Sequence, residues 1–302
     1  MARRVVIRVI LVLLFCALFC KACLVRDKII PSNNINISTN EVLNLSYPTP
    51  VNVTKNGVDY LESQAPIGKF GGELISSTIG EGPKTFNPFN SKDATSSTLA
   101  GIMYDGLLTT DPINGQPIPK LAKSFRILPD GKTYIINLRR GIKWSDGKPI
   151  TADDVVFTWR DIIFAGLGDT SLRDSLYIED KLPTVRKIDD YTVEFVTPEP
   201  YAPFIRSLGT SIAPKHFFEK AVKAGGKTFD TFLSTTTKPQ DIVVSGAFKL
   251  KEYVPAQRVV YERNPNYYEI NKDGQKLPYL DRLIYLIVAD LNNEVLKFEG
   301  KE

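Results

Sequence analysis

Strand patterns and helix patterns alternate along this 302-residue chain, and the alternation limits its fold more than any other feature. Short apolar or alternating runs at Glu73–Ile79, Thr133–Leu138 and Leu283–Val288 indicate strands. Apolar residues at helical spacing indicate helices over Ser96–Leu108 and from Thr151 onward. Strands and helices intermixed in this way predict an α/β or α+β fold, and the length suffices for two ordinary domains or one large one.

The strongest helix signal begins at Thr151. The Thr151 hydroxyl can cap the first turn while Asp154, three residues later, reaches back to the cap, an arrangement called a capping box. The apolar positions that follow predict the buried face of this helix: Val155, Val156, Trp159, Ile162 and Ile163. Further along, alternation predicts a strand and then a hairpin, at Tyr191–Val196, Val243–Lys251 and Arg258–Glu262.

Arginines at positions 3, 4 and 8 precede an unbroken apolar run, Val9–Cys20. This run has 12 residues, whereas a helix that spans a bilayer needs about 20. A basic start followed by a short apolar core is typical of an export signal, which we place at residues 1–23. An uncleaved membrane anchor is the alternative, because Val5–Ile7 lengthens the apolar run.

All three cysteines, Cys16, Cys20 and Cys23, lie in this segment, so the rest of the chain has no disulfide and no cysteine nucleophile. Cys23 after Ala22 resembles the lipidation site of bacterial lipoproteins, in which that cysteine becomes the acylated N-terminus. Lys21 and Cys20 depart from the pattern. The sequence leaves three outcomes open for the N-terminus: cleavage, lipidation at Cys23, or retention as an anchor.

Residues 24–66 are rich in Asn, Ser, Thr and Pro and show no sustained hydrophobic period. We interpret them as an irregular tether that holds a folded domain away from a membrane or wall. The folded body is predicted to fill residues 67–302. The formal net charge is +4, and without the three N-terminal arginines the body is close to neutral, so no nucleic-acid partner is expected.

Residue types and spacings give little support for catalysis. His216 is the only histidine and stands beside Phe217 and Phe218, where a packed or capping role is favoured. A Ser-His-Asp or Cys-His arrangement lacks its parts, since no G-x-S-x-G motif is present and no cysteine follows residue 23. A His-based metal site and the glycine-rich nucleotide motifs are missing as well, so no cofactor and no metal are predicted.

Two pairs of adjacent acids, Asp153–Asp154 and Asp189–Asp190, are the remaining candidates for chemistry. A pair of carboxylates could serve glycoside hydrolysis. However, adjacent residues of a helix point about 100° apart, and acids at a helix N-terminus are favoured by the helix dipole. We therefore assign the first pair to capping and the second to a turn, and keep a hydrolase as a minor alternative.

Several stretches of the chain, in a fixed order from about residue 70 to about residue 290, match one family pattern. They are Gly80–Pro88, Met103–Leu107, Pro119–Ala122, Asp130–Tyr134, Leu138–Val155, Asn264–Tyr268 and Leu277–Asp281. The most specific is Leu138–Val155, which reads L-R-R-G-I-K-W-S-D-G-K-P-I-T-A-D-D-V. Together they resemble the bacterial extracellular solute-binding proteins of family 5, the peptide and nickel type, which feed ABC importers.

The resemblance implies an α/β fold, the periplasmic-binding-protein type II fold of the cluster C kind. Residues 67–302 would form its first, N-terminal lobe, with a small α+β subdomain inserted at about residues 104–197, and the second lobe is expected to be absent. At Val244–Phe248 the chain reads V-S-G-A-F where the family often has G-T-G-P-[YF]. Family members are also considerably longer.

By the same resemblance, the chain is a non-enzymatic binding component that captures oligopeptides or dipeptides for an inner-membrane ABC permease. It would be exported, and either periplasmic or anchored to the outer face of the cytoplasmic membrane. Relatives take up peptides, nickel, haem and sugars, and a single histidine disfavours a His-rich nickel site. A separately encoded C-terminal half is a further expected partner. The alternative is a truncated or split-gene remnant without independent ligand binding.

Ligand contacts are expected in loops at strand ends that face a cleft. The candidates follow the first strand, end the first helix and form the late turn: Glu81, Gly82, Pro83, Tyr104, Gly246, Ala247 and Phe248. A structural role, as a turn glycine or a packed aromatic, is an equal alternative for each. Trp144–Gly147 is expected to be a structural turn.

Overall fold

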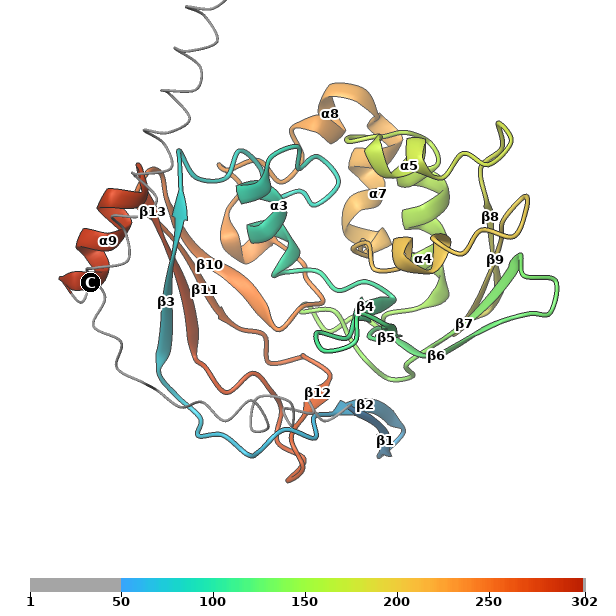
Figure 1. Cartoon of the computed structure of the whole chain (residues 1–302), viewed down its shortest axis with the longest axis horizontal. Helices are drawn as coiled ribbons and strands as arrows, with labels where there is room; N and C mark the ends of the chain where they lie inside the picture. The colour runs from blue at the N-terminus through green and yellow to red at the C-terminus, as the bar shows by residue number, and fades with distance from the viewer. Residues whose placement is uncertain (1–49, 301–302) are drawn as a thin grey trace, which may run out of the picture. The chain divides into compact units, whose positions relative to one another are not determined.

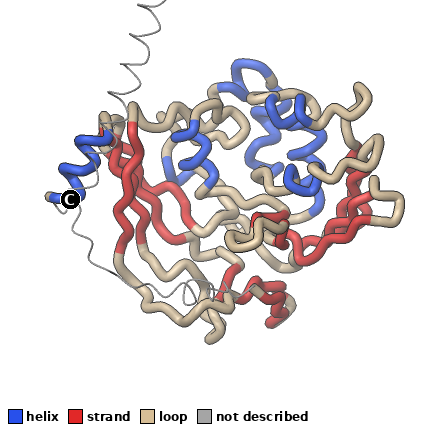
Figure 2. Tube along the Cα trace, in the orientation of Figure 1, coloured by secondary structure: helices blue, strands red, loops and turns tan. Residues whose placement is uncertain are grey.

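The computed structural model describes residues 50–300 of the chain. The predicted export signal or anchor at residues 1–23, with the candidate lipidation site Cys23, and residues 24–49 of the predicted tether lie outside the described residues. Within residues 50–300, none of the helices has both the length and the apolar character needed to cross a membrane. The described residues form two main β-sheets, with most of the helices between them (Figures 1 and 2).

The first sheet has four strands in the order β10 (Phe248–Val254), β11 (Arg258–Arg263), β13 (Arg282–Val288) and β3 (Glu73–Ile79). The strand β11 is antiparallel to both of its neighbours, β10 and β13, whereas β13 and β3 run parallel. One face of this sheet packs against helix α3 (Ala94–Gly101), and the buried hydroxyl of a β11 tyrosine donates a hydrogen bond of 2.8 Å to a carbonyl of that helix. The sheet and α3 therefore share one hydrophobic core.

The second sheet is antiparallel, in the order β6 (Ala122–Ile127), β7 (Thr133–Leu138), β9 (Thr192–Val196) and β8 (Thr184–Asp189). It packs against α4 (Ala152–Val156) and the π-helix η2 (Phe157–Ile163), which continues α4 directly. The central contact is the buried ring of Trp159, which meets Phe195 of β9 edge-on with ring centres 5.1 Å apart. This sheet and helix pair form a second core.

The remaining elements connect these layers. A small sheet joins β1 (Val51–Lys55), β2 (Val58–Glu62) and β12 (Glu269–Ile270), and β4 (Leu108–Thr110) pairs with β5 (Pro117–Pro119). The other helical elements are α5 (Ser171–Ser175), α6 (Phe204–Ser207), α7 (Lys215–Ala224), α8 (Gly226–Asp230), the 3-10 turn η3 (Pro239–Asp241) and α9 (Leu291–Glu299).

Most of the predicted elements are confirmed. The strands at residues 73–79 and 133–138 have the predicted bounds, and those at 191–196 and 283–288 differ by one residue. The hairpin of β10 and β11 forms, but β10 begins five residues later than predicted. The capping box is also present: Asp154 Oδ2 accepts a hydrogen bond of 2.9 Å from the backbone N–H of Thr151. The predicted apolar face of that helix is buried throughout.

The helix predicted over Ser96–Leu108 is shorter than expected. It begins at Ala94, where Asp93 Oδ1 caps the Ser96 N–H at 2.8 Å, and it ends at Gly101. Met103 and Leu107 are buried as their apolar character predicts, but they lie outside the helix. The physical reason is tertiary: the chain after Gly101 forms hydrogen bonds to segments far along the sequence, which replace those of a continued helix.

Residues 51–62 differ from the irregular tether that composition indicates, because they form the β1–β2 hairpin. Asn56 and Gly57 both have positive φ at its turn, and Asn-Gly is a strong hairpin signal that the compositional reading missed. The buried carboxylate of Asp59 fixes the hairpin to the body. It accepts hydrogen bonds from Lys123 Nζ at 2.8 Å and from the Arg140 N–H at 3.0 Å.

Asp130 organises the turn between β6 and β7. Its Oδ1 accepts hydrogen bonds from the N–H groups of Lys132 and Thr133, each at 2.9 Å, and its Oδ2 accepts one of 2.6 Å from the Thr133 hydroxyl. These hydrogen bonds, the one from the Thr133 hydroxyl above all, hold the pKa of Asp130 below its usual value of 3.8.

This contact predicts part of the acid sensitivity of the fold. Such a carboxyl has a lower pKa in the folded chain than in the unfolded chain. It stabilises the fold at pH values above its unfolded pKa, and this contribution is lost as the pH falls through its folded pKa. The urea midpoint of unfolding should therefore fall as pH is lowered through the usual aspartate pKa of 3.8 and below it, and Asp130→Asn should reduce that fall. Asp273→Asn, at an exposed turn residue, is the control. An unchanged pH slope in Asp130→Asn would contradict the assignment.

Candidate functional site

Two of the family-like stretches meet the late turn in one place, which we call the motif joint: Met103, Asp105, Ser245, Gly246 and Asn264. The N–H groups of Ser245 and Gly246 donate hydrogen bonds to the Met103 carbonyl, at 3.1 and 2.8 Å. In return, the Asp105 N–H donates to the Ser245 hydroxyl at 2.9 Å. The Asn264 side-chain amide then donates to the Gly246 carbonyl at 2.8 Å. The joint thus connects the end of the first helix, the late turn and the segment after β11.

Two glycines allow the backbones to cross closely here. A Cβ atom on Gly246 would lie 2.5 Å from the Ile102 carbonyl oxygen, and one on Gly106 would lie 2.3 Å from the Gly209 carbonyl oxygen. Real Cβ contacts are not this short, so only glycine fits without a shift of the backbone. Small residues in these stretches therefore serve close packing.

The Trp144–Gly147 turn is structural, as predicted. The Gly147 N–H donates to the Trp144 carbonyl at 2.9 Å, which closes the turn. The Ser145 N–H donates a hydrogen bond of 2.9 Å to the Val244 carbonyl, and the Val244 N–H donates one of 3.0 Å to the Ser145 hydroxyl. The indole of Trp144 is fully buried. This signature therefore fastens the second core to the late turn, and it exposes no aromatic surface for a ligand.

A cluster of charged groups lies next to the motif joint, and we call it the ion cluster: Asp105, Lys120, Tyr267, Tyr268 and Glu269. Lys120 Nζ contacts the Glu269 carboxylate and donates to the Tyr267 hydroxyl at 2.7 Å, and it lies 3.9 Å from Asp105 Oδ1. The Tyr268 hydroxyl donates to Asp105 Oδ2 at 2.8 Å. Burial raises the pKa of the Asp105 carboxyl, and the Lys120 ammonium opposes that rise. Lys120 is therefore the ammonium that compensates two poorly solvated carboxylates.

The predicted contact residues differ widely in exposure. Tyr104 is only 3% exposed, and its ring meets Phe218 edge-on with centres 6.3 Å apart. Gly246 is buried in the motif joint, whereas Ala247 and Phe248 are half-buried. Glu81 is exposed, and the two residues that follow it are buried. Tyr104 and Gly246 thus support the site from within, and Glu81 offers the most accessible side chain.

The structure also separates these residues into two groups. Tyr104 and the late turn meet at the motif joint, where β10 begins with Phe248. The Glu81–Pro83 loop lies at the other end of the same sheet, because a Cβ on Gly82 would be 2.7 Å from Ile287 near the end of β13 and 3.6 Å from the Tyr253 hydroxyl near the end of β10. The candidate contact residues therefore lie in two groups, one at each end of the first sheet.

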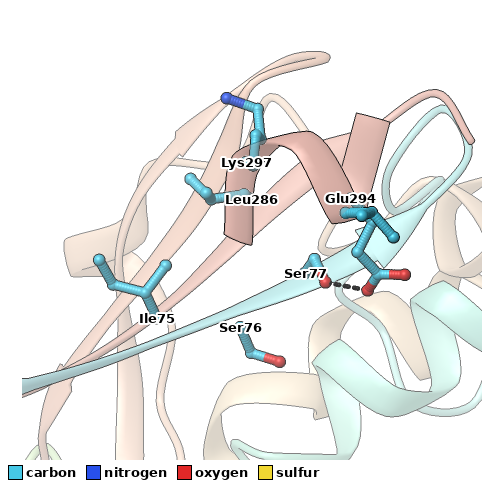
Figure 3. Close-up of a pocket in the computed structure, with 7 residues that line it drawn as sticks. Ile75, Ser76, Ser77, Leu286, Glu294 and Lys297 are labelled. Atoms are coloured by element: carbon cyan, nitrogen blue, oxygen red, sulfur yellow. Dashed lines mark hydrogen bonds between the residues drawn. The ribbon is translucent and has the colours of Figure 1, made fainter. Parts of the chain in front are cut away.

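A surface that the sequence reasoning missed lies along β3 and α9. A cavity of about 360 Å³ separates α9 from β3 and β13 (Figure 3), and its lining residues are Ile75, Ser76, Ser77, Leu286, Glu294, Val295 and Lys297. The Ser77 hydroxyl donates to the Glu294 carboxylate across it. A second cavity, of about 340 Å³, lies between β3 and α3. The signal in the sequence is the apolar run of β3, which predicts a strand but not the exposure of its side chains.

The acids and the histidine have structural partners. Asp154 is buried and accepts hydrogen bonds of 2.9 Å from the N–H groups of Thr151 and Lys215, whereas Asp153 is exposed and pairs with Lys187 at 2.8 Å. His216 Nε2 lies 2.8 Å from Asp146 Oδ2 at the surface. Among residues 50–300, no group of three or more His, Cys, Asp or Glu side chains is arranged to hold a metal.

These features define a lobe of a type II periplasmic-binding protein: a mixed α/β body with open sheets. The fold matches the oligopeptide-binding protein AppA from Bacillus subtilis, solved with a nonapeptide, with a TM-score of 0.61 and 28% identity. That match covers 77% of this chain and 43% of the other. Residues 116–302 match the family model described as bacterial extracellular solute-binding proteins, family 5 Middle. The chain belongs to this family, which is a family of binding proteins and not of enzymes.

Curated relatives agree with this assignment. A probable ABC transporter-binding protein from Deinococcus radiodurans is 34% identical over 221 residues, which are 71% of this chain and 37% of that protein. The periplasmic oligopeptide-binding protein OppA from Escherichia coli is 29% identical over 263 residues, 82% of this chain and 43% of that protein. The chain therefore spans about two fifths of the length of these relatives.

Proposed function

We propose that this chain is the N-terminal part of a peptide receptor, a binding component that presents peptides to an ABC permease of the cytoplasmic membrane. The observation that carries the proposal is the family match combined with relatives whose names or titles state oligopeptide binding. Export to the periplasm, or anchoring to the outer face of the membrane, belongs to the proposal, as does a separately encoded C-terminal half. The hydrogen bonds of the motif joint hold the late turn in place at one end of the first sheet, and this supports a binding role.

For the domain organisation, we propose that residues 67–302 are one lobe and that about 104–197 form an inserted subdomain. The second sheet supports this division, because its four strands, with α4 and η2 that pack on them, lie within residues 122–196. The first sheet is built from strands before and after this stretch. Within the lobe, the exposed Glu81 and the Glu81–Pro83 backbone are the proposed ligand contacts. Tyr104, Gly246, Ala247 and Phe248 act by shaping the other end of the sheet.

Isothermal titration with a dipeptide, a nonapeptide and an oligosaccharide tests the proposal. The chain is titrated alone and again after co-expression with the C-terminal part of the Deinococcus radiodurans relative, which is the part that this chain does not match. We expect heat with peptide and none with the oligosaccharide. Glu81→Ala should weaken peptide binding about tenfold, the cost of one hydrogen bond to a charged group. Glu199→Ala, at an exposed acid just after the subdomain, should not. Absence of peptide binding in both preparations would favour a remnant without independent ligand binding.

A further inference from the structure

A pocket of about 180 Å³ lies where β2, the loop after β7 and the segment between β11 and β13 meet. We call it the lysine pocket, and the residues of its wall that matter here are Tyr60, Gly141, Ile142, Lys143, Tyr268 and Lys276. All of them precede β13. This strand is seven residues and about 20 Å long, and it separates the segment that lines the pocket from α9. The pocket is therefore remote from α9.

Two lysines, Lys143 and Lys276, line this pocket without a carboxylate beside them. Within residues 50–300, no acidic side chain forms a salt bridge with either ammonium group. Lys276 Nζ donates to the Pro265 carbonyl at 2.9 Å, which is a neutral acceptor. Burial lowers the pKa of Lys276, and the positive charge of Lys143 lowers it further. The two ammonium groups thus repel each other and lack the compensation that Lys120 has in the ion cluster.

The backbone of the loop after β7 adds hydrogen-bond donors to the same pocket. Its Arg140 N–H already binds a carboxylate, that of Asp59, at 3.0 Å. The N–H groups of the next three residues, Gly141, Ile142 and Lys143, donate to no other group of the described chain. Gly141 has a φ of +77°, in the left-handed region. Successive N–H groups in such a turn form a concavity that binds anions.

A buried arginine places further positive charge next to the pocket wall. Arg139 is fully buried, its Nη1 donates to the Tyr60 carbonyl at 3.2 Å, and its guanidinium carbon lies 5.8 Å from the ring centre of Tyr268. Its Nη2 has no hydrogen-bond partner among residues 50–300. The nearby acids Asp59 and Glu269 are each already paired with another lysine. Positive charge is therefore in excess around the pocket.

We propose that the lysine pocket binds a phosphate group. Lys143 and Lys276 supply ammonium donors, and the backbone of Gly141, Ile142 and Lys143 supplies N–H donors. A tetrahedral phosphate presents more acceptor oxygens than the two of a carboxylate, so it can meet donors on several sides of the pocket. Inorganic phosphate and a phospholipid headgroup share this chemistry. The inference does not depend on the proposed function, because no residue of the lysine pocket is a proposed peptide contact.

Isothermal titration at constant ionic strength tests the pocket with potassium phosphate, potassium acetate, and vesicles of phosphatidylglycerol or phosphatidylcholine. We expect saturable binding of phosphate and none of acetate. Binding of phosphatidylglycerol vesicles without binding of free phosphate would assign the site to a headgroup. Lys143→Gln and Lys276→Gln should each weaken binding about tenfold, the cost of one hydrogen bond to a charged group. Lys227→Gln, at an exposed lysine of α8, is the control and should leave the affinity unchanged.

Thermal unfolding gives a second readout. A ligand that binds only the folded state stabilises it, so phosphate should raise the melting temperature of the wild-type chain and of Lys227→Gln. It should not raise that of the double variant Lys143→Gln with Lys276→Gln, which circular dichroism must show to be folded.

Failure of both phosphate and phosphatidylglycerol to bind would overturn the proposal. Equal losses in the lysine-pocket variants and in Lys227→Gln would overturn it as well, and so would acetate binding as tightly as phosphate. The titration is repeated after co-expression with the C-terminal part of the Deinococcus radiodurans relative. Loss of phosphate binding in that preparation would also contradict the proposal, because the added part would then be the partner of the two lysines.

Discussion

Replacing Lys120 by alanine should lower the free energy of unfolding by about 3–5 kcal/mol, because it breaks a buried ion pair from one side only. The ammonium lies between the carboxylates of Asp105 and Glu269 and also donates to the Tyr267 hydroxyl. Without it, two carboxylates with side chains only 15% and 20% exposed face each other with little water to screen them. Urea unfolding followed by circular dichroism measures the loss.

Lys148→Ala is the control for this prediction. The Lys148 side chain is 59% exposed and lies 3.9 Å from Asp146, so its removal should change stability by no more than about 1 kcal/mol. A double variant, Lys120→Met with Glu269→Gln, should lose less than the single Lys120→Ala change, since it removes a negative charge together with the positive one. If Lys120→Ala lowered the free energy of unfolding no more than Lys148→Ala does, Lys120 would have no compensating role in the ion cluster.

Gly106→Ala should destabilise the fold by about 3 kcal/mol, at the upper end of what overpacking costs. The added Cβ would lie 2.3 Å from the Gly209 carbonyl oxygen, which is backbone and cannot turn away as a flexible side chain would. The two segments would have to separate near the motif joint. Thermal and urea unfolding should both show the loss.

Gly101→Ala separates this clash from the general effect of adding a methyl group. Gly101 ends α3, and a Cβ there meets no atom within 4 Å. The change should therefore be neutral or stabilise by up to about 1 kcal/mol, because alanine favours the helix. Equal stability of the two variants would show that the backbone at residue 106 relaxes freely.

The parts of the fold that follow from local pattern were predictable from the sequence. The β3 and β7 bounds follow from short runs of apolar residues, and the helix start at Thr151 follows from a cap that acts within four residues. The end of α3 was not predictable in this way. The chain leaves the helix at Gly101 because hydrogen bonds to Ser245 and Gly246, far along the sequence, replace the helical ones.

The sequence did not predict which of the candidate site residues lie together, for a related reason. The candidate contact residues were grouped because each follows a strand or ends a helix. The end of the sheet at which each residue lies, however, depends on the order of the strands in that sheet. Glu81 and Phe248 consequently lie at opposite ends of one sheet. Residues in the most recognisable stretches, such as Trp144 and Gly246, proved to hold segments together. A pattern can identify a family through residues that pack, without marking those that meet a ligand.

The parallel pairing of β3 with β13 has a consequence for the order of folding. Glu73 of β3 pairs with Arg282 of β13, so the contact joins segments roughly 200 residues apart, and such contacts form slowly because the loop between them must close first. The second sheet, by contrast, joins segments within residues 122–196. During synthesis the strands of the second sheet can therefore pair early, whereas β3 has no partner until roughly 200 further residues, up to β13, have been made.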